Sequence, residues 1–216
     1  MFTVEFHCHT YASPDSRVSP ADLVAACRQR GLDRVVVTDH WNLAGALEAR
    51  ALDPELVILG EEVLTDRGEL LAAFVTELIP RGMPYRQAIA ALRQQGAFIS
   101  VSHPFDPRRS FWSPAELEEL TGLVDAFETF NARNLLPGYN RKAAEFAAAH
   151  GLPGTAGSDA HTLEELGRAT MRLPDFADGD GLRAAIGQAE FRARRSAPWV
   201  RVRSGWARMM KARRRW

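Results

Sequence analysis

The sequence predicts an α/β fold in which a distorted barrel of about seven strands alternates with helices. Three observations support this prediction. Short apolar or β-branched runs alternate with helix-like segments along the chain. Capping residues and glycines mark where several helices begin and end. Polar clusters rich in histidine and carboxylate follow the strands, which favours a barrel whose strand ends meet at one mouth.

The composition is that of a globular domain. The chain has 216 residues, of which 46% are hydrophobic and 25% charged, enough for one domain with its own core. The two cysteines, Cys8 and Cys27, imply no disulfide framework and fit a reducing cytoplasm. No apolar run reaches the roughly 20 residues that span a bilayer, and the N-terminus lacks a signal-peptide pattern. We therefore expect a cytoplasmic protein.

The charge of the chain is unevenly distributed although its formal net charge is zero. Residues 192–216 contain ten Lys or Arg and no acid, which leaves 17 basic against 27 acidic residues in 1–191. We expect a barrel over residues 1–195 and a basic C-terminal tail over 196–216. Bound cations would offset many of the acids in the barrel.

The first half of the chain shows clear signals for individual elements. Residues 2–6 alternate as a strand does, and Ser19-Pro20 supplies an N-cap and a first-turn proline for a helix that Gly31 ends. The run Val35-Val36-Val37 is typical of a buried parallel strand. In this half we expect strands at residues 2–6, 34–38, 56–59 and 69–76 and helices at 21–30 and 43–50.

The second half repeats the pattern. Gly96 ends one predicted helix, Ser113-Pro114 repeats the cap and proline signal, and Gly151 ends an alanine-rich helix. We expect helices at residues 84–95, 113–120, 140–149 and 178–187. We expect strands at residues 97–101, 123–127, 152–155, 169–173 and 190–192.

Five of the six histidines lie in short islands that follow predicted strands, at His7-Cys8-His9, Asp39-His40, Ser102-His103 and Asp159-Ala160-His161. Because side chains two residues apart in a strand face the same way, His7 and His9 can hold one metal ion together. Asp159 and His161 repeat this spacing. Histidine and carboxylate are the usual ligands of borderline divalent metals, so the islands predict a metal site.

Other candidate ligands are less certain from their residue types alone. Asp39 can orient His40 or a neighbouring ligand, or it can simply cap the next helix and leave His40 exposed. Asp15 is either a ligand or a turn residue. Of the adjacent glutamates after Gly60, one should face inward, and spacing does not decide between Glu61 and Glu62.

Three further residues follow later strands. Pro104 ends the strand at His103 and fixes the loop after it. Asn131 can act as a weak oxygen ligand or contact substrate. Arg133 can bind a phosphate with its planar fork, or it can be an ordinary surface residue.

Taken in order, these motifs resemble the PHP (polymerase and histidinol phosphatase) family over roughly residues 1–195. The motifs are His7-x-His9-Thr10, Thr38-Asp39-His40-Trp41-Asn42, Gly60-Glu61-Glu62, Ser102-His103-Pro104-Phe105 and Gly157-Ser158-Asp159-Ala160-His161. The resemblance implies a distorted (β/α)7 barrel with a trinuclear metal site at the carboxyl ends of its strands.

The resemblance also implies a ligand set. The first metal would be bound by His7, His9, Glu62 and Asp159, with Glu62 chosen because the family pattern reads Gly-x-Glu. Glu62 would bridge to a second metal held by His103, and Asp15, His40 and His161 would bind a third. Asp15 and Asn131 stand where some relatives have histidine, so Glu69 is a further candidate for the second metal. The three divalent ions would be Zn, Mn or Fe.

We expect the protein to hydrolyse a small phosphate monoester or a nucleotide resembling a nucleoside bisphosphate, because clustered metals polarise phosphoryl oxygens and activate water. Asp39 and His161 are the candidate catalytic residues. The candidate substrate-binding residues are Asn131, Arg133, Arg108 and Arg109. The alternatives are an exonuclease of either polarity on short oligonucleotides, or a non-catalytic barrel with a binding tail.

The tail allows three interpretations. It can be a solvated, partly helical extension, a nucleic-acid contact in which tryptophans stack on bases, or an amphipathic segment on an anionic membrane. Trp206, Met209 and Met210 have helical spacing, but the sequence does not separate these possibilities. The oligomeric state is also not predicted.

Overall fold

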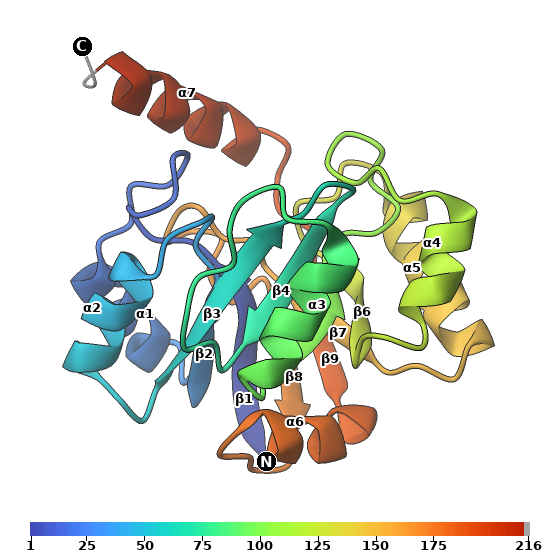
Figure 1. Ribbon diagram of the computed structural model, residues 1–216. Coiled ribbons are helices and arrows are strands. Elements are labelled where there is room, and N and C mark those ends of the chain that lie inside the picture. The colour runs from blue at the N-terminus through green and yellow to red at the C-terminus, as the bar shows by residue number, and fades with distance from the viewer. Residues whose placement is uncertain (214–216) are drawn as a thin grey trace.

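The computed structural model describes residues 1–213 as a nearly closed, mixed barrel with helices around it (Figure 1). The strands are β1 Phe2–Cys8, β2 Arg34–Val37, β3 Val57–Leu64, β4 Glu69–Ala73, β5 Phe98–Val101, β6 Ala126–Asn131, β7 Gly154–Gly157, β8 Ala169–Leu173 and β9 Glu190–Ala193. The helices are α1 Pro20–Gln29, α2 Ala44–Leu52, α3 Tyr85–Gln94, α4 Pro114–Leu120, α5 Pro137–Ala149, α6 Gly179–Ala185 and α7 Val200–Arg213, with a 3-10 turn at Ile186–Gln188. Each predicted strand and helix is present, although several begin or end a few residues away from the predicted bounds.

The sheet has the strand order β7-β6-β5-β4-β3-β2-β1-β8-β9. The pairs β1–β2, β2–β3, β5–β6 and β6–β7 are parallel, as predicted. The prediction of a parallel sheet is wrong for β4, β8 and β9, which run antiparallel to their neighbours. The turn between β3 and β4 is closed by the Thr65 amide, which donates to the Gly68 carbonyl at 2.9 Å, and it leaves no room for the helix that a parallel connection needs.

The sheet closes where the chain leaves β7 beside the end of β1. The His9 amide donates to the Ala160 carbonyl at 2.8 Å, and the Ala160 amide donates to the His7 carbonyl at 3.2 Å. These two bonds place the first and last histidine motifs of the sequence next to each other.

Two apolar clusters hold the barrel. The inner cluster takes side chains from β1 to β8, with Phe6 and Phe98 in an edge-to-face contact at 5.6 Å, and it is closed below by Leu182 and Ile186 of the α6 region (Figure 1). The outer cluster packs α1 to α5 against the other side of the sheet. Since the lower end is filled, the upper end remains for polar side chains.

Strand β6 begins later than predicted, and this shift matters for the site. Leu123 and Val124 pack in the outer cluster after α4, and Asp125 accepts a hydrogen bond from the Ile99 amide at 2.8 Å. The strand therefore starts at Ala126, and Glu128 lies inside it rather than after it.

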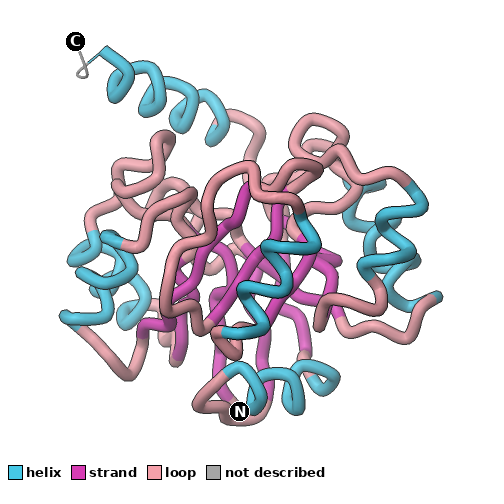
Figure 2. The backbone as a smooth tube through the Cα atoms, in the orientation of Figure 1, coloured by secondary structure: helices cyan, strands magenta, loops and turns pink. Residues whose placement is uncertain are grey.

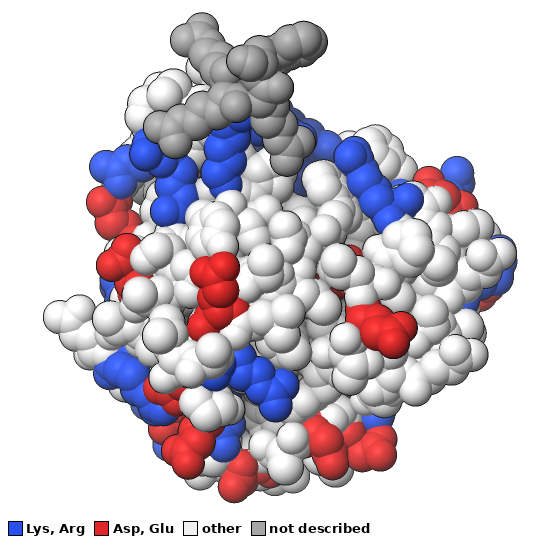
Figure 3. Space-filling view, turned by 60° about the vertical axis from the view of Figure 1, so that its left-hand side comes forward, with Lys and Arg blue, Asp and Glu red and all other residues white. Residues whose placement is uncertain are grey.

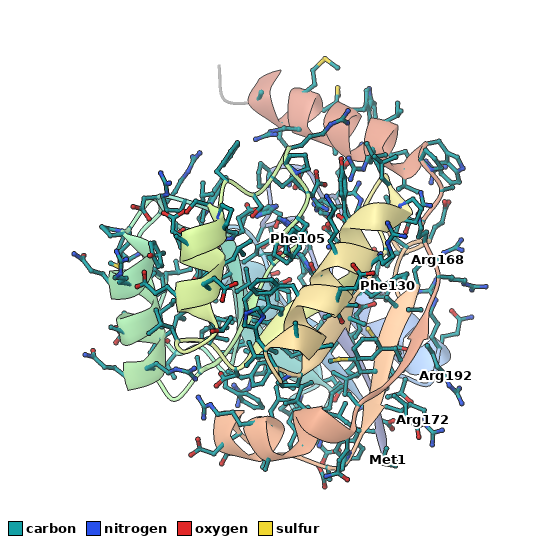
Figure 4. All side chains as sticks on the ribbon, turned by 90° about the vertical axis from the view of Figure 1, so that its right-hand side faces the viewer. Met1, Phe105, Phe130, Arg168, Arg172 and Arg192 are labelled. Carbon is teal, nitrogen blue, oxygen red and sulfur yellow. The ribbon has the colours of Figure 1, made fainter. Side chains whose placement is uncertain are left out.

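The sheet ends at β9, whose residues are all exposed. Arg192 pairs with Thr170 across the β8–β9 ladder, and Figure 4 shows Arg168, Arg172 and Arg192 along this outer edge. Charged side chains on an edge strand discourage pairing with another chain.

Helix α7 lies across the loops at the upper end of the barrel (Figures 1 and 2). Val200, Ser204 and Ala207 on its inner face are buried, whereas Trp199 and Val202 are exposed. Within the described residues, no helix is long and apolar enough to cross a membrane.

Candidate metal centre

The candidate ligands converge at the upper end of the barrel, beneath α7. Each lies at the end of a strand or in the loop that follows it, and nearly all are buried. These residues are His7, His9, Asp15, His40, Glu62, His103, Asp159 and His161.

The four residues expected around a first ion lie close together. His7 Nε2 is 3.2 Å from Glu62 Oε2 and 3.7 Å from Asp159 Oδ1. His9 Nε2 is 3.4 Å from the same Glu62 oxygen and 3.5 Å from the same Asp159 oxygen. Two imidazole nitrogens therefore face the same pair of carboxylate oxygens.

Glu62 lies at the centre of the whole cluster. Its Oε2 also lies 3.3 Å from His40 Nδ1, whereas its Oε1 lies 3.0 Å from His103 Nε2 and accepts a hydrogen bond from Ser102 Oγ at 2.8 Å. The neighbouring Glu61 points elsewhere, and its Oε2 accepts the Ile79 amide at 3.0 Å. Glu62 is the glutamate with the geometry of a bridging ligand.

The remaining candidates flank this centre on two sides. Glu69 Oε2 is 3.3 Å from His103 Nε2. On the other side, Asp15 Oδ1 is 3.2 Å from His161 Nε2 and 3.8 Å from His40 Nε2. The expected second and third ligand groups are thus each brought together, around His103 and around Asp15.

The spacing of these atoms fits bound cations. Two ligand atoms about 2.1 Å from one ion at a tetrahedral angle lie about 3.4 Å apart, close to the distances around Glu62 and Asp159. Among residues 1–213, no hydrogen-bond partner is found for four buried atoms, namely His7 Nε2, His9 Nε2, His40 Nδ1 and Asp15 Oδ1. Since buried polar atoms are normally paired, these four atoms have the arrangement of metal ligands.

Two of the candidate ligands have strained backbones. His103 has φ 27° and Asp159 has φ 52°, both in the left-handed region that side chains with a Cβ rarely adopt. Such strain costs about 1–3 kcal/mol and concentrates at functional sites. Both side chains contact other members of the cluster, His103 through Glu62 and Asp159 through His7 and His9.

Glu128 stands behind the cluster, and the sequence did not single it out. Its Oε1 is 2.9 Å from His7 Nδ1, and its Oε2 accepts the His103 amide at 2.8 Å and Asn131 Nδ2 at 3.0 Å. A carboxylate on the far nitrogen of a ligand histidine fixes its tautomer and its orientation. The available signal was an acid between the apolar residues Phe127 and Phe130 of a strand.

Gly157 leaves room for this pair of side chains. A Cβ at Gly157 would collide with the Cβ of His7 and with Oε1 of Glu128. The glycine that opens the Gly157-Ser158-Asp159 motif is therefore required by close packing beneath the cluster.

Through Ser13, Asp39 is connected to the ring of His9 and to the backbone amide of His40. It accepts hydrogen bonds from the Thr10 amide at 2.7 Å and from Ser13 Oγ at 2.5 Å, and Ser13 Oγ lies 3.1 Å from His9 Nδ1. Asp39 is fully buried and does not line the cavity above the cluster. These contacts fit a positioning residue better than the catalytic residue that we expected.

Burial and neighbouring charges shift the pKa values of residues in the cluster in opposite directions. Burial alone would lower the pKa of His103, but hydrogen bonds to Glu62 and Glu69 raise it to about 9. Burial acts to raise the pKa of Asp159, but His7 and Arg109 hold it well below its usual range. The ionised carboxylates thus favour positive charge at the centre of the site.

A cavity of about 290 Å³ opens above the cluster and is bordered by basic side chains. Arg109 lines it, donates to Asp159 Oδ2, and is itself held by Asp106 at 3.1 Å. Arg108 is exposed and also lines the cavity. Figure 3 shows Lys and Arg side chains gathered at the α7 end of the molecule.

Arg133 lines the same cavity, but its guanidinium is engaged on all sides. NH1 is 2.8 Å from His161 Nδ1, NH2 donates to Ser204 Oγ of α7 at 2.7 Å, and Nε is 2.9 Å from Glu165 Oε1. Arg133 therefore holds His161 and α7 in place, and it has little capacity left to bind a phosphate.

Asn131 is fully buried beside the cluster and does not line the cavity. Its Nδ2 donates to Glu128 Oε2 at 3.0 Å and to Asp159 Oδ2 at 3.2 Å. These contacts orient two carboxylates, so the structure supports a positioning role rather than direct contact with substrate.

The chain is similar to known proteins in sequence and in structure. A family model described as PHP domain matches residues 5–97, and one described as PHP-associated matches residues 137–191. An uncharacterised protein of Methanocaldococcus jannaschii is 31% identical over 177 residues, which cover 80% of this chain and 71% of the relative.

Solved structures share the fold. A two-domain protein from Bacteroides vulgatus, described as containing a predicted PHP-like metal-dependent phosphoesterase, is 20% identical, with a TM-score of 0.72 over 89% of this chain and 65% of that one. A lesion-specific endonuclease from Pyrococcus furiosus is 18% identical, with a TM-score of 0.63 over 88% of this chain and 57% of that one. Together with the sequence matches and the site geometry, these similarities show that the chain belongs to the PHP family.

Proposed function

We propose that the protein is a metal-dependent phosphoesterase that hydrolyses a small phosphate monoester, with nucleotides, including nucleoside bisphosphates, as the favoured substrates. One observation carries this proposal: imidazoles and carboxylates from strands far apart in sequence meet around Glu62, beneath a cavity bordered by arginines.

In this proposal the candidate ligands form three groups, each around one cation. We assign His7, His9, Glu62 and Asp159 to one divalent cation. We assign Glu62, His103 and Glu69 to a second cation, and Asp15, His40 and His161 to a third. Such cations, of Zn, Mn or Fe, would polarise the phosphoryl oxygens and activate a water molecule for hydrolysis.

The basic residues take separate roles in this proposal. Exposed Arg108 lines the cavity and is our candidate for binding the non-reacting phosphate oxygens. Arg109 also lines the cavity, but its guanidinium nitrogens contact Asp106, Asp159 and Asn134, so it chiefly orients Asp159. Arg133 positions His161 through its contact with Nδ1. His161 lines the cavity, and because a nitrogen bound to a cation carries no proton, His161 can transfer a proton to the leaving group only when the third cation is absent.

The proposal is tested by a phosphatase screen of nucleotides and sugar phosphates with Zn, Mn or Fe, on the wild type and on Asp159→Ala. We expect turnover by the wild type and turnover no higher than background in the variant, because Asp159 contacts both His7 and His9 and is assigned as a ligand. Asp175→Ala, at an exposed aspartate outside the cluster, is the control. Equal turnover by Asp159→Ala and the wild type would refute the proposal.

A nuclease is the second candidate. The cavity is bordered by arginines from separate segments, including Arg81 and Arg208, so the basic surface extends beyond a single phosphate. Incubation with end-labelled short oligonucleotides separates the two functions. Stepwise ladders would favour exonuclease activity, single internal cuts would favour an endonuclease, and release of terminal phosphate alone would favour the phosphatase.

A further inference from the structure

A second cavity of about 340 Å³ lies between α7 and the loops of the barrel. Asp15, Arg17 and His161 line it from the barrel, and Trp206 and Ala207 line it from α7. Its size lies within the range of small-molecule sites, about 300–1,000 Å³, and the surface exposed inside it is almost entirely apolar.

This cavity adjoins the metal centre. Asp15 and His161, which form the proposed third ligand group, line both this cavity and the cavity above Glu62. The two cavities therefore adjoin each other at Asp15 and His161.

The aromatic wall of this cavity is Trp206. Its side chain is about half exposed, and the Arg17 guanidinium lies over the indole at 5.4 Å from the ring centroid. An aromatic face beside a cation suits a flat, electron-rich ring, which gains both stacking and cation–π attraction.

The position of Trp206 is fixed from several sides. Ser204 is bound by Arg133 at 2.7 Å, Arg203 pairs with Glu164 at 2.8 Å, and Lys211 Nζ donates to the Ser13 carbonyl at 2.6 Å. These contacts hold α7 on the barrel, so the wall is present before a ligand arrives and little ordering is needed on binding.

We propose that this cavity is the subsite for the leaving group and that it selects esters carrying a flat aromatic group, of which a nucleobase is the natural example. Trp206 is then a specificity-determining residue. The proposal rests on the proposed phosphoesterase function for its link to turnover, but the binding of an aromatic group at Trp206 can be measured without catalysis.

Trp199, in the turn directly before α7, provides a matched control. It is 51% exposed, against 50% for Trp206, and it also lies under an arginine, since Arg203 is 4.9 Å from its ring centroid. Trp199 does not line the cavity. The two tryptophans therefore differ in their position relative to the cavity while their exposure and their cationic neighbour are alike.

The first measurement compares adenosine monophosphate with glycerol phosphate as substrates. We expect Trp206→Ala to raise KM for the nucleotide about tenfold, the size of one base-stacking contact, and to change KM for glycerol phosphate less than twofold. Trp206→Phe should recover most of the nucleotide KM, and Trp199→Ala should change neither. Equal effects of Trp206→Ala on the two substrates, or no effect, would overturn the proposal.

The second measurement is quenching of tryptophan fluorescence by adenosine monophosphate in the full chain treated with chelator. We expect the quenching to persist in Trp199→Ala and to disappear in Trp206→Ala.

Quenching without turnover of any phosphate ester would support the subsite and contradict the proposed function. Turnover with unchanged quenching in Trp206→Ala would contradict the subsite alone. Quenching lost only in Trp199→Ala would place the aromatic contact on the outer face of α7 and overturn the proposal.

Discussion

Single residues behind the cluster determine how its ligands are held. Glu128 contacts His7 and the amide of His103, and Ser13 connects Asp39 to His9. A ligand histidine whose far nitrogen is held by a partner presents one tautomer in one orientation, which raises its affinity for metal.

Glu128→Gln should therefore weaken metal binding without unfolding the protein. The amide keeps the shape of the side chain but loses the charge facing His7, and we expect a 10–100-fold loss of metal affinity. Metal titration by calorimetry measures this. Glu118→Gln, which changes the partner of His150 on an exposed surface, is the control and should bind metal like the wild type. Equal affinities in all three proteins would show that Glu128 does not orient the ligand.

The sequence predicted the residues of the cluster better than the residues that support it. Strand geometry identified His7 and His9 as a pair, because side chains two apart face the same way, whereas the full ligand set, including Glu62, followed from the resemblance to the PHP family. Glu128 was missed because β6 was predicted to end at residue 127, which left that acid in a loop. Arg133 was predicted to contact phosphate. Its contact with Ser204 was not predicted, because Ser204 lies on a helix that is far from Arg133 in the sequence.

At the level of elements, the local signals for helix ends were reliable. Ser19 caps α1 by accepting the Asp22 amide, and Ser113 and Glu116 form a reciprocal capping box at α4. These bonds depend only on residues three apart, so the sequence contains them completely. The directions of β4, β8 and β9 depend on how the chain connects one strand to the next. The periodicity of residues within a strand does not predict these connections.

The capping box at α4 has a pH-dependent contribution to stability. Partial burial acts to raise the pKa of Glu116 from 4.5, but hydrogen bonds from Arg67 and Ser113 lower it to about 2. Because the folded pKa is depressed, the ionised form stabilises the fold above pH 4.5, and this contribution is lost as the pH falls toward about 2.

Glu116→Gln keeps the capping box, since glutamine also serves at this position, but removes the charge that faces Arg67 and the helix N-terminus, so we expect it to lower the free energy of unfolding by about 0.5 kcal/mol at pH 7. The difference from the wild type should shrink as the pH falls below 4.5. Urea denaturation at several pH values measures it, with Glu145→Gln on the exposed side of α5 as the control. A difference that is constant with pH would show that the charge of Glu116 does not contribute.

For the whole molecule, helix α7 packs against the candidate site. Helix α7 buries Val200, Ser204 and Ala207, and it contacts Arg133 beside the cluster. Binding of nucleic acid or of an anionic membrane by the basic tail remains a prediction. Deleting residues 197–216 would also remove the contact between Arg133 and α7. Binding to oligonucleotides and to anionic liposomes is therefore better measured in the full chain, by comparing the wild type with Val202→Ser, a change on the exposed face of α7.

Removal of metal should destabilise the protein more strongly as the pH rises. Burial acts to lower the pKa of His103, but its carboxylate neighbours raise it to about 9, so in the metal-free protein its charged form stabilises the fold below pH 6.5 and this contribution is lost as the pH rises through 9. Metal binding requires the neutral imidazole and therefore strengthens over the same interval.

We thus expect the decrease in Tm caused by chelator to be larger at pH 9 than at pH 6.5. Thermal unfolding with EDTA or with added Mn²⁺ at the two pH values measures it. The same decrease at both values, or a larger decrease at pH 6.5, would contradict the assignment of His103 as a ligand.

The central claim is that distant imidazoles and carboxylates bind divalent cations together. The most direct measurement is anomalous X-ray scattering from crystals of the full chain grown with Mn²⁺. We predict anomalous peaks among His7, His9, Glu62 and Asp159, and further peaks beside His103 and beside Asp15. A map with no peak within coordination distance of Glu62, from crystals that contain Mn²⁺ at millimolar concentration, would contradict the claim.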